Sequence, residues 1–189
     1  MSTKYLSGII GLLVACIINL AGAEGSLVVF DGGKNCAGSS WSDPPQITKF
    51  FLTGAEADGA RRLRFEGEWK DYWAGGGWNW TNWQGPGSDV TSYGSLTVTF
   101  RKVEGEQLRD VWFQLADAAN KTTPQVKLIE AKFLNVLPGE FTTVSIPLTS
   151  LTGGADLKTV CSLNIGFVPS TANGKGAIEI SRIQFDPKK

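Results

Sequence analysis

Tryptophan is concentrated in one short stretch of this 189-residue chain. The segment WAGGGWNWTNW, residues 73–83, contains four of the seven tryptophans: Trp73, Trp78, Trp80 and Trp83. An indole offers a large flat apolar surface and one N–H donor, so it belongs either in a core or on a surface that binds a flat ligand. A sugar ring has apolar C–H faces and polar edges. A site for it therefore needs aromatic platforms flanked by amide, carboxylate and basic groups.

A further tryptophan stands on the polar phase of an alternating segment. In VWFQL, residues 111–115, the apolar residues at every second position are expected to face a core, which places Trp112 and Gln114 on the opposite face. The same alternation in LNIGF, residues 163–167, places Asn164 outside the core. A tryptophan in a row that should be solvated predicts that a loop or a ligand covers it.

The predicted ligand contacts are aromatic, amide or basic residues off the core phase or in the tryptophan-rich segment: Trp112, Gln114, Asn164, Arg64, Trp73, Trp83, Trp78, Trp80 and Lys132. Arg64 and Lys132 are expected on the same sheet face as Trp112. Two alternatives stay open. Trp78 and Trp80 share one face, so both could be core residues, with residues 75–77 (GGG) giving the strand room to bend or bulge. Trp112 could be buried under a loop.

The charges of the chain balance, with 18 Lys and Arg against 18 Asp and Glu, and the chain has no histidine. A nucleic-acid binder that tracks phosphates is disfavoured, because no basic stripe stands out. The lack of histidine excludes Ser-His-Asp and Cys-His catalysis and histidine-ligated zinc.

A glycosidase would need two carboxylates about 5–10 Å apart across a cleft. The candidates are acids near one another in sequence or on a predicted sheet: Glu66, Glu68, Asp71, Asp117 and Glu130. Acidic residues are common on any surface, so we predict no catalytic residue, and binding is favoured over catalysis.

The elements that would position these residues are strands, because apolar residues recur at a spacing of two and helical periodicity is nearly absent. The predicted strands are residues 27–31, 63–66, 96–100, 111–115, 128–134, 141–146, 163–167 and 177–185. Gly, Pro, Asn and Asp separate them as turn signals. Strands at this spacing predict an all-β antiparallel β-sandwich or jelly roll, as one domain over residues 24–189.

The first 23 residues are typical of an export signal. Lys4 precedes an apolar stretch over residues 9–20, and residues 21–23 (AGA) fit a cleavage site, so we expect a secreted or cell-envelope protein. In an alternative interpretation, residues 13–16 (LVAC) form a lipobox, and a lipid on Cys16 would attach the protein to a membrane.

Two cysteines, Cys36 and Cys161, remain after the export signal. An even pair in an oxidising compartment predicts one disulfide across a long loop. The alternative is two unpaired thiols, one of them packed in a strand.

The second half of the chain resembles a known fold family. The segments LTVTFRKVEGEQLRDVWFQLADA, GEFTTVSIPLTSL and VCSLNIGFVPSTANGKGAIEISRIQF, with GSLVVFDGG near the start, resemble strands of galactose-binding-like β-sandwiches, namely carbohydrate-binding modules of the family 11 kind. The glycine–tryptophan stretch is also similar to a C-terminal module of some secreted β-glucan hydrolases. The resemblance implies binding of β-glucan on the concave face of one sheet.

The same resemblance implies a structural Ca²⁺ in many members. Asp31 matches the acid of the first strand, whereas Ser181 stands where the second acid is common. Calcium is therefore possible but not required. The tyrosine-rich cleft of these glucan binders is not reproduced, because the chain has only three tyrosines, and its supply of aromatic rings for a ligand is tryptophan.

The sequence thus predicts a secreted, monomeric β-sandwich that binds β-glucan-like polysaccharide without catalysis, and no nucleic acid. The alternatives are a module associated with a glycoside hydrolase and a protein-interaction domain that uses the tryptophan-rich surface.

Overall fold

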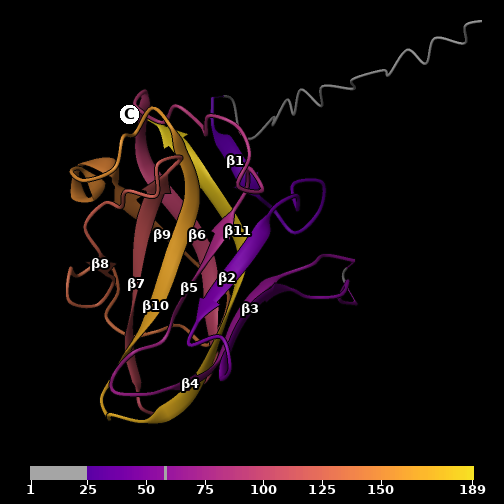
Figure 1. Ribbon diagram of the computed structural model, residues 1–189, viewed down its shortest axis with the longest axis vertical. Helices are drawn as coiled ribbons and strands as arrows, with labels where there is room; N and C mark the ends of the chain where they lie inside the picture. The colour runs from indigo at the N-terminus through magenta and orange to yellow at the C-terminus, as the bar shows by residue number, and fades with distance from the viewer. Residues whose placement is uncertain (1–24, 58) are drawn as a thin grey trace, which may run out of the picture.

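The chain folds into two antiparallel sheets packed face to face (Figure 1). The computed structural model describes residues 25–57 and 59–189. The six-stranded sheet contains β1 (Leu27–Phe30), β3 (Thr48–Leu52), β4 (Leu63–Trp69), β6 (Tyr93–Glu104), β9 (Thr142–Pro147) and β11 (Gly174–Pro187). The five-stranded sheet contains β2 (Ser39–Asp43), β5 (Gly75–Asn79), β7 (Leu108–Asp117), β8 (Val126–Lys127) and β10 (Val160–Pro169). A short 3₁₀ helix, η1 (Leu148–Leu151), follows β9. The predicted all-β sandwich is confirmed.

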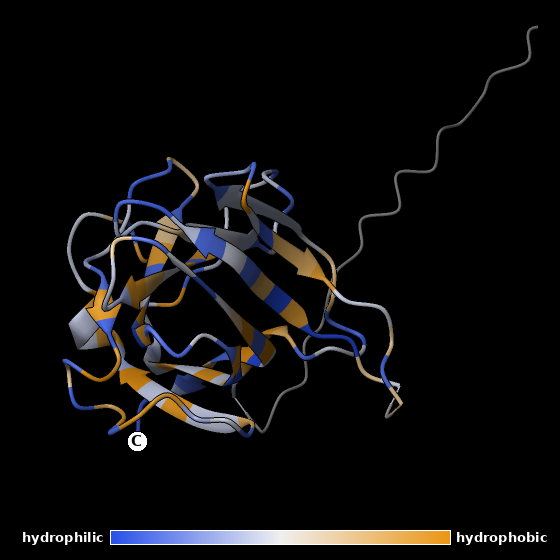
Figure 2. Ribbon diagram, turned by 90° about the horizontal axis from the view of Figure 1, so that it is seen from below, coloured by the Kyte–Doolittle hydropathy of each residue, from blue (hydrophilic) through white to orange (hydrophobic). Residues whose placement is uncertain are grey.

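The strand order places the longest strands at the centre of each sheet. The six-stranded sheet runs β3-β4-β11-β6-β9, with β1 also paired to β11, and the five-stranded sheet runs β2-β5-β10-β7-β8. Apolar and polar residues alternate along these strands, which Figure 2 shows as bands of colour. The apolar faces meet between the sheets, where the Phe65 ring lies 4.6 Å from Phe167 and Phe100 lies 5.7 Å from Phe113, centroid to centroid.

One predicted strand is largely a turn. Residues 128–134 follow the two-residue strand β8 as consecutive turns. The buried Asp110 carboxylate accepts the backbone N–H groups of Ile129 and Glu130 at 3.0 Å, and so takes donors that a strand ladder would need. Lys132 has a left-handed backbone with φ 63° and lies exposed in this turn.

The predicted disulfide is wrong, because Cys36 and Cys161 are both free thiols. Cys36 lies in the β1–β2 loop and its thiol donates to the Gly33 carbonyl at 3.1 Å. Cys161 is buried in β10, where its sulfur accepts from the Asn79 amide at 3.4 Å. Each thiol thus has its own local partner, and burial raises the pKa of both.

The export signal, residues 1–23, and Cys16 lie outside the described residues. Over residues 25–57 and 59–189, no helix is long and apolar enough to cross a membrane.

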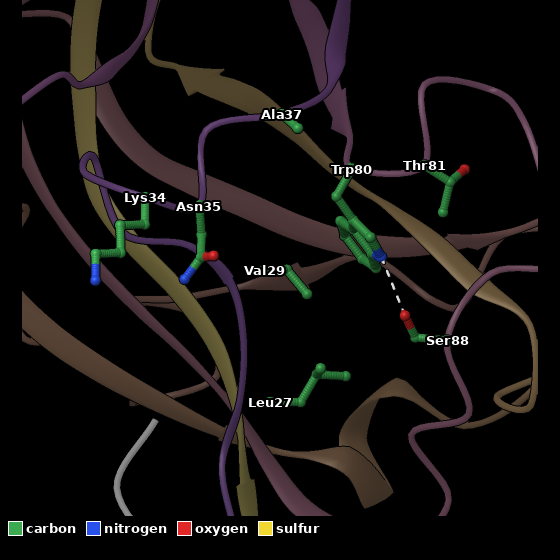
Figure 3. A pocket seen from close by; sticks show the side chains of 8 residues that line it. All are labelled: Leu27, Val29, Lys34, Asn35, Ala37, Trp80, Thr81 and Ser88. Atoms are coloured by element: carbon green, nitrogen blue, oxygen red, sulfur yellow. Dashed lines mark hydrogen bonds between the residues drawn. The ribbon is translucent and has the colours of Figure 1, made fainter. Parts of the chain in front are cut away.

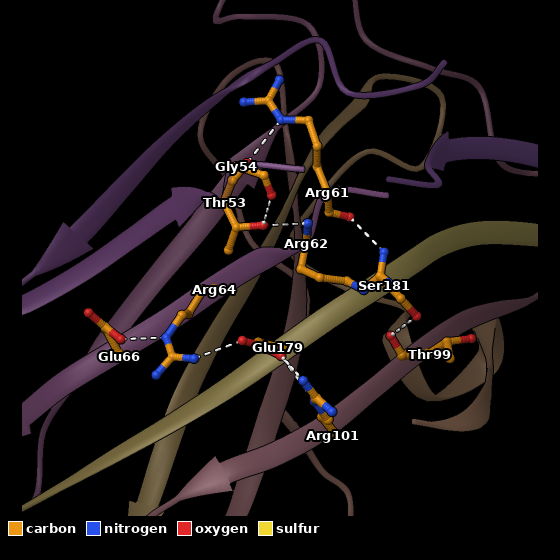
Figure 4. A network of polar contacts seen from close by, with 10 residues as sticks. All are labelled: Thr53, Gly54, Arg61, Arg62, Arg64, Glu66, Thr99, Arg101, Glu179 and Ser181. Carbon is orange, nitrogen blue, oxygen red and sulfur yellow. Dashed lines mark hydrogen bonds and ion pairs between the residues drawn. The ribbon is translucent and has the colours of Figure 1, made fainter. Parts of the chain in front are cut away.

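The outer face of the six-stranded sheet carries an ion-pair network centred on Glu179 (Figure 4). Its carboxylate accepts from Arg64 at 2.7 Å and from Arg101 at 2.7 Å, and only 4% of Glu179 is exposed. Arg64 also pairs with Glu66, and the Arg101 guanidinium lies 4.6 Å from the centroid of the Phe141 ring. Burial alone would raise the pKa of Glu179. The hydrogen bonds and charges of Arg101 and Arg64 outweigh it and lower that pKa.

Replacing Glu179 with glutamine is expected to reduce the free energy of unfolding at pH 7 by about 1–2 kcal/mol, because two arginines lose their shared carboxylate. A folded-state pKa below the unfolded one stabilises the protein above the ordinary glutamate value of 4.5. That stabilisation disappears as the pH falls through the lowered pKa, so the variant and the natural protein should converge in acid.

Urea unfolding at a series of pH values measures this difference, with the exposed Glu140→Gln as the matched control. An equal loss of stability in Glu179→Gln at every pH would show that packing, not charge, accounts for it.

Candidate functional site

The outer face of the five-stranded sheet is arranged in three rows of residues that lie side by side on β2, β5, β10 and β7. Their order follows from the strand register: Asp43, Gly75, Gly166 and Trp112 in the first row; Trp41, Gly77, Asn164 and Gln114 in the second; Ser39, Asn79, Ser162 and Ala116 in the third. The intervening residues, such as Trp78, Leu163 and Phe113, are buried in the core. Successive rows are two residues, or about 7 Å, apart along each strand.

Three indoles lie against the glycines of this face. A Cβ atom on Gly77 would lie 2.3 Å from Nε1 of Trp41, and one on Gly166 would lie 2.2 Å from Cζ2 of Trp112. A Cβ on Gly75 would lie 3.0 Å from Cζ2 of Trp73. The rings therefore occupy the space where side chains of β5 and β10 would stand. Glycine at these positions lets the indoles lie directly on the sheet backbone.

Gly76, the middle residue of the glycine triplet, faces the other way. A Cβ there would lie 3.2 Å from the Phe65 ring and 3.3 Å from Cβ of Phe50. The glycine triplet thus leaves space on both faces of β5. Gly75 and Gly77 leave space for indole rings on the outer face, and Gly76 leaves space for phenylalanines of the core.

Trp73 covers Trp112. Their rings stack with centroids 5.9 Å apart and planes inclined by 24°. Only 4% of Trp112 is exposed, against 37% of Trp73. Trp112 does leave the core side of its strand, as the alternation predicts, but it lies beneath Trp73. It is a support for Trp73 and not itself an open platform.

Trp73 is held in place from two sides. Its indole N–H donates to the carboxylate of Asp43 on β2. The segment 70–74 between β4 and β5 closes on itself through hydrogen bonds between the backbones of Lys70 and Trp73 at 2.9 and 3.2 Å. The Tyr72 N–H donates to the Ala172 carbonyl at 3.0 Å, which ties the segment to the turn before β11. Trp73 is therefore presented in one orientation.

Amide groups lie next to the indoles. Asn164 is 8% exposed, and its Oδ1 accepts from the Ser162 hydroxyl at 3.1 Å. Gln114 lies opposite Asn164 on β7, and its Nε2 donates to the Thr123 carbonyl at 2.6 Å. The pair forms a fixed polar strip beside the aromatic rings.

Five of the predicted contacts do not share this face with Trp112: Trp78, Trp80, Arg64, Lys132 and Trp83. Trp78 is 3% exposed and packs in the core, 6.1 Å from Phe30, which is the alternative left open for it. Trp80 is half-buried against the core residue Phe185. The predicted placement of Arg64 and Lys132 beside Trp112 is wrong, because Arg64 belongs to the six-stranded sheet and Lys132 to the turn after β8.

Trp83 lies in the β5–β6 loop, where half of it is exposed. Its backbone N–H donates to Oδ1 of Asn79, in the third row, at 3.0 Å. It therefore lies beyond the end of the face and not on it.

Trp41 belongs to the site but is not among the predicted contacts. It lies in SSWSD, which forms the edge strand β2, where no alternating apolar residues mark a strand. The sequence signal that could have identified Trp41 is a single large apolar residue among serines. An edge strand that packs little against the core does not need an indole for stability, so a tryptophan there indicates a surface role.

The described residues do not fit a calcium site at Asp31. Oδ1 of Asp31 accepts the N–H groups of Gly33 and Asn35, and Oδ2 accepts from the Asn35 amide, each at 2.9 Å. Ser181, at the other position expected from the resemblance, donates to the Thr99 carbonyl at 3.4 Å. Across residues 25–57 and 59–189, no three His, Cys, Asp or Glu side chains are grouped to hold a metal ion.

Three of the five candidate catalytic carboxylates have partners of their own: Asp117, Glu130 and Glu66. Asp117 accepts the N–H groups of Ala119, Lys121 and Asp156 at 2.9 Å, which fixes the turn after β7. Glu130 pairs with Lys127 at 2.8 Å. Glu66 lies on the six-stranded sheet with Arg64. These acids are thus parts of three separate local structures.

Comparison with known proteins gives matches in structure only. No protein-family model and no curated protein sequence matches the chain. The family 30 carbohydrate-binding module of a cellulosomal cellulase of Clostridium thermocellum superposes with a TM-score of 0.62 at 16% identity, covering 87% of this chain and 98% of that one.

Two further matches are described by a β-linked saccharide or by an enzyme that acts on one. The family 11 carbohydrate-binding module from Clostridium thermocellum, solved with a β-1,3-1,4-mixed-linked tetrasaccharide, has a TM-score of 0.56 at 10% identity, over 86% of this chain and 95% of that one. A β-1,2-glucanase from Parabacteroides distasonis has a TM-score of 0.57 at 16% identity, over 87% of this chain and 25% of its own. The chain therefore has the β-sandwich fold of family 11 and family 30 carbohydrate-binding modules.

Proposed function

We propose that this protein binds a β-glucan-like polysaccharide, without catalysis, on the outer face of the five-stranded sheet. The observation that carries the proposal is that the indoles of Trp41 and Trp73 lie against Gly77 and Gly75 of one strand. Gly75 and Gly77 are two residues, or about 7 Å, apart along β5, so the two indoles follow one another along the strand, which suits an extended chain of sugar rings. Each ring would receive the apolar face of a sugar, and the Asn164–Gln114 strip would meet its hydroxyl edge.

The other outer face of the sandwich carries an ion-pair network at its centre. On the six-stranded sheet, Arg64, Arg101 and Glu179 satisfy one another, so a ligand would have to break ion pairs in order to bind there. The solved family 11 module is in complex with a β-1,3-1,4-mixed-linked tetrasaccharide, which supports a β-glucan-like polysaccharide as the ligand class. The proposal includes export from the cell, from the pattern of residues 1–23, and a monomer that needs no metal.

Affinity electrophoresis tests the proposal. The folded protein should be retarded in gels that contain mixed-linkage β-glucan, and its retardation should vary among laminarin, xylan and cellulose derivatives. Reducing sugar should not be released over hours of incubation. Unchanged mobility in every one of these gels would refute polysaccharide binding, and release of sugar would refute its non-catalytic character.

A further inference from the structure

A pocket of about 460 Å³ lies at one end of the sandwich, apart from the three rows of the sheet face (Figure 3). Its apolar wall consists of Leu27 and Val29 of β1 and the indole of Trp80, which follows β5. Leu27 and Val29 lie close together on one strand, and both line the pocket. Lys34 and Asn35 of the β1–β2 loop, with Thr81 and Ser88 of the β5–β6 loop, supply the polar wall.

The Trp80 ring is fixed in this pocket. Its indole N–H donates to the Ser88 hydroxyl at 3.3 Å, and its edge packs against Phe185 with centroids 6.2 Å apart. Figure 3 shows the ring on one side of the pocket, with Asn35 across from it and Leu27 and Val29 below. The half-buried indole therefore offers a platform that needs no rearrangement before binding.

Each polar wall is held in place by one side chain that accepts several hydrogen bonds. The Asp31 carboxylate accepts hydrogen bonds from the backbone N–H and the side-chain amide of Asn35. The backbone N–H of Asp31 donates to the Asn35 carbonyl at 3.2 Å. On the opposite wall, Oδ1 of Asn79 accepts from the N–H of Thr81 at 3.0 Å and from its hydroxyl at 2.9 Å. Two loops, each fixed by its own hydrogen bonds, therefore face each other across the cavity.

The chemistry of the walls selects the class of ligand. A purely apolar molecule would strip water from the polar groups of Asn35, Thr81 and Ser88 that are not bonded within the protein, at a cost for each such group. A strongly anionic ligand would meet only one cation of the wall, Lys34. A single neutral sugar unit fits both walls, with a C–H face on Trp80 and hydroxyls toward the amide and hydroxyl groups. Cavities of roughly 300–1,000 Å³ hold small-molecule ligands, so this pocket has room for one or two rings.

We propose that this pocket is a second carbohydrate site, which takes the terminal sugar unit of a short or exposed saccharide chain. The site is separate from the sheet face, while the choice of a sugar as its ligand rests on the proposed function. The sheet face is open at the side and suits the interior of a long chain. The pocket is enclosed by two loops and suits an end.

The test uses cellobiose and laminaribiose as probes and ¹H–¹⁵N NMR as the readout. Titration should give saturable shifts of the Trp80 indole N–H and of the Thr81 and Ser88 amides. Trp80→Ala would also remove packing against Phe185, so the diagnostic variant is Ala37→Trp, which places a bulky side chain at an exposed residue of the pocket wall. It should weaken disaccharide binding at least about tenfold, while retention by β-glucan gels persists.

The outcomes separate the two sites. Saturable shifts that persist in Trp73→Ala, after polymer retention is lost, support the pocket as a site of its own. Saturable disaccharide shifts in a protein that no polysaccharide retards support the pocket and refute the proposed function. Retention by β-glucan without any disaccharide shift at Trp80, Thr81 or Ser88 overturns the pocket proposal and leaves the proposed function standing. Unchanged disaccharide affinity in Ala37→Trp also overturns it.

Discussion

Replacing Trp73 with alanine is expected to weaken binding of mixed-linkage β-glucan about 30-fold, or about 2 kcal/mol, as for a central aromatic contact of an interface. Trp73 is the more exposed ring of the Trp73–Trp112 stack, and Asp43 fixes its orientation. Its removal uncovers Trp112, but that ring lies against Gly166 of β10 and so cannot take the place of Trp73 over Gly75 of β5. The measurement is affinity electrophoresis over a range of glucan concentrations.

Trp83→Ala is the matched control for this variant. It removes the same side chain from an exposed position in the β5–β6 loop, beyond the rows of the sheet face. It should leave the affinity within about twofold, because exposed residues outside an interface contribute little. If Trp83→Ala lost binding and Trp73→Ala kept it, the ligand would lie at the end of the sandwich and not along β5.

The alternation of apolar residues predicted which residues leave the core, and there it succeeded. Trp112, Gln114 and Asn164 stand on the outer side of their strands, as their phase requires. Alternation does not tell which of the two outer faces a strand contributes to. Arg64 was expected beside Trp112 for that reason, and it lies on the opposite sheet, because β4 pairs with β11 and β3.

Features that depend on contacts distant in sequence were not predictable in the same way. The cover over Trp112 comes from a loop between β4 and β5, whose path is set by hydrogen bonds to Asp43 and to Ala172. The glycine triplet was expected to let a strand bend, whereas Gly75 and Gly77 make room for indoles that come from other segments. Trp41 reaches Gly77 only through the pairing of β2 with β5.

Replacing Gly166 with alanine is expected to reduce the free energy of unfolding by up to about 3 kcal/mol and to abolish retention by β-glucan. The new Cβ would lie 2.2 Å from Cζ2 and 2.3 Å from Cε2 of Trp112. The indole cannot rise away from the sheet without displacing Trp73, which stacks on it. A change of one methyl group beneath the stack therefore moves the ring that the ligand is proposed to contact. Urea unfolding and affinity electrophoresis of the same sample measure the two effects together.

Two further variants make this prediction specific. Gly139→Ala adds the same methyl group at a position with no neighbour within 4 Å, and should change neither stability nor retention. In a Trp112→Ala background the ring that Gly166→Ala would strike is absent, so the second substitution should cost almost no further stability. The double-mutant cycle then gives a coupling of opposite sign to the single effects, because the two residues share one clash. Additive losses would mean that Gly166 is needed for the strand itself, and that the indole does not rest on it.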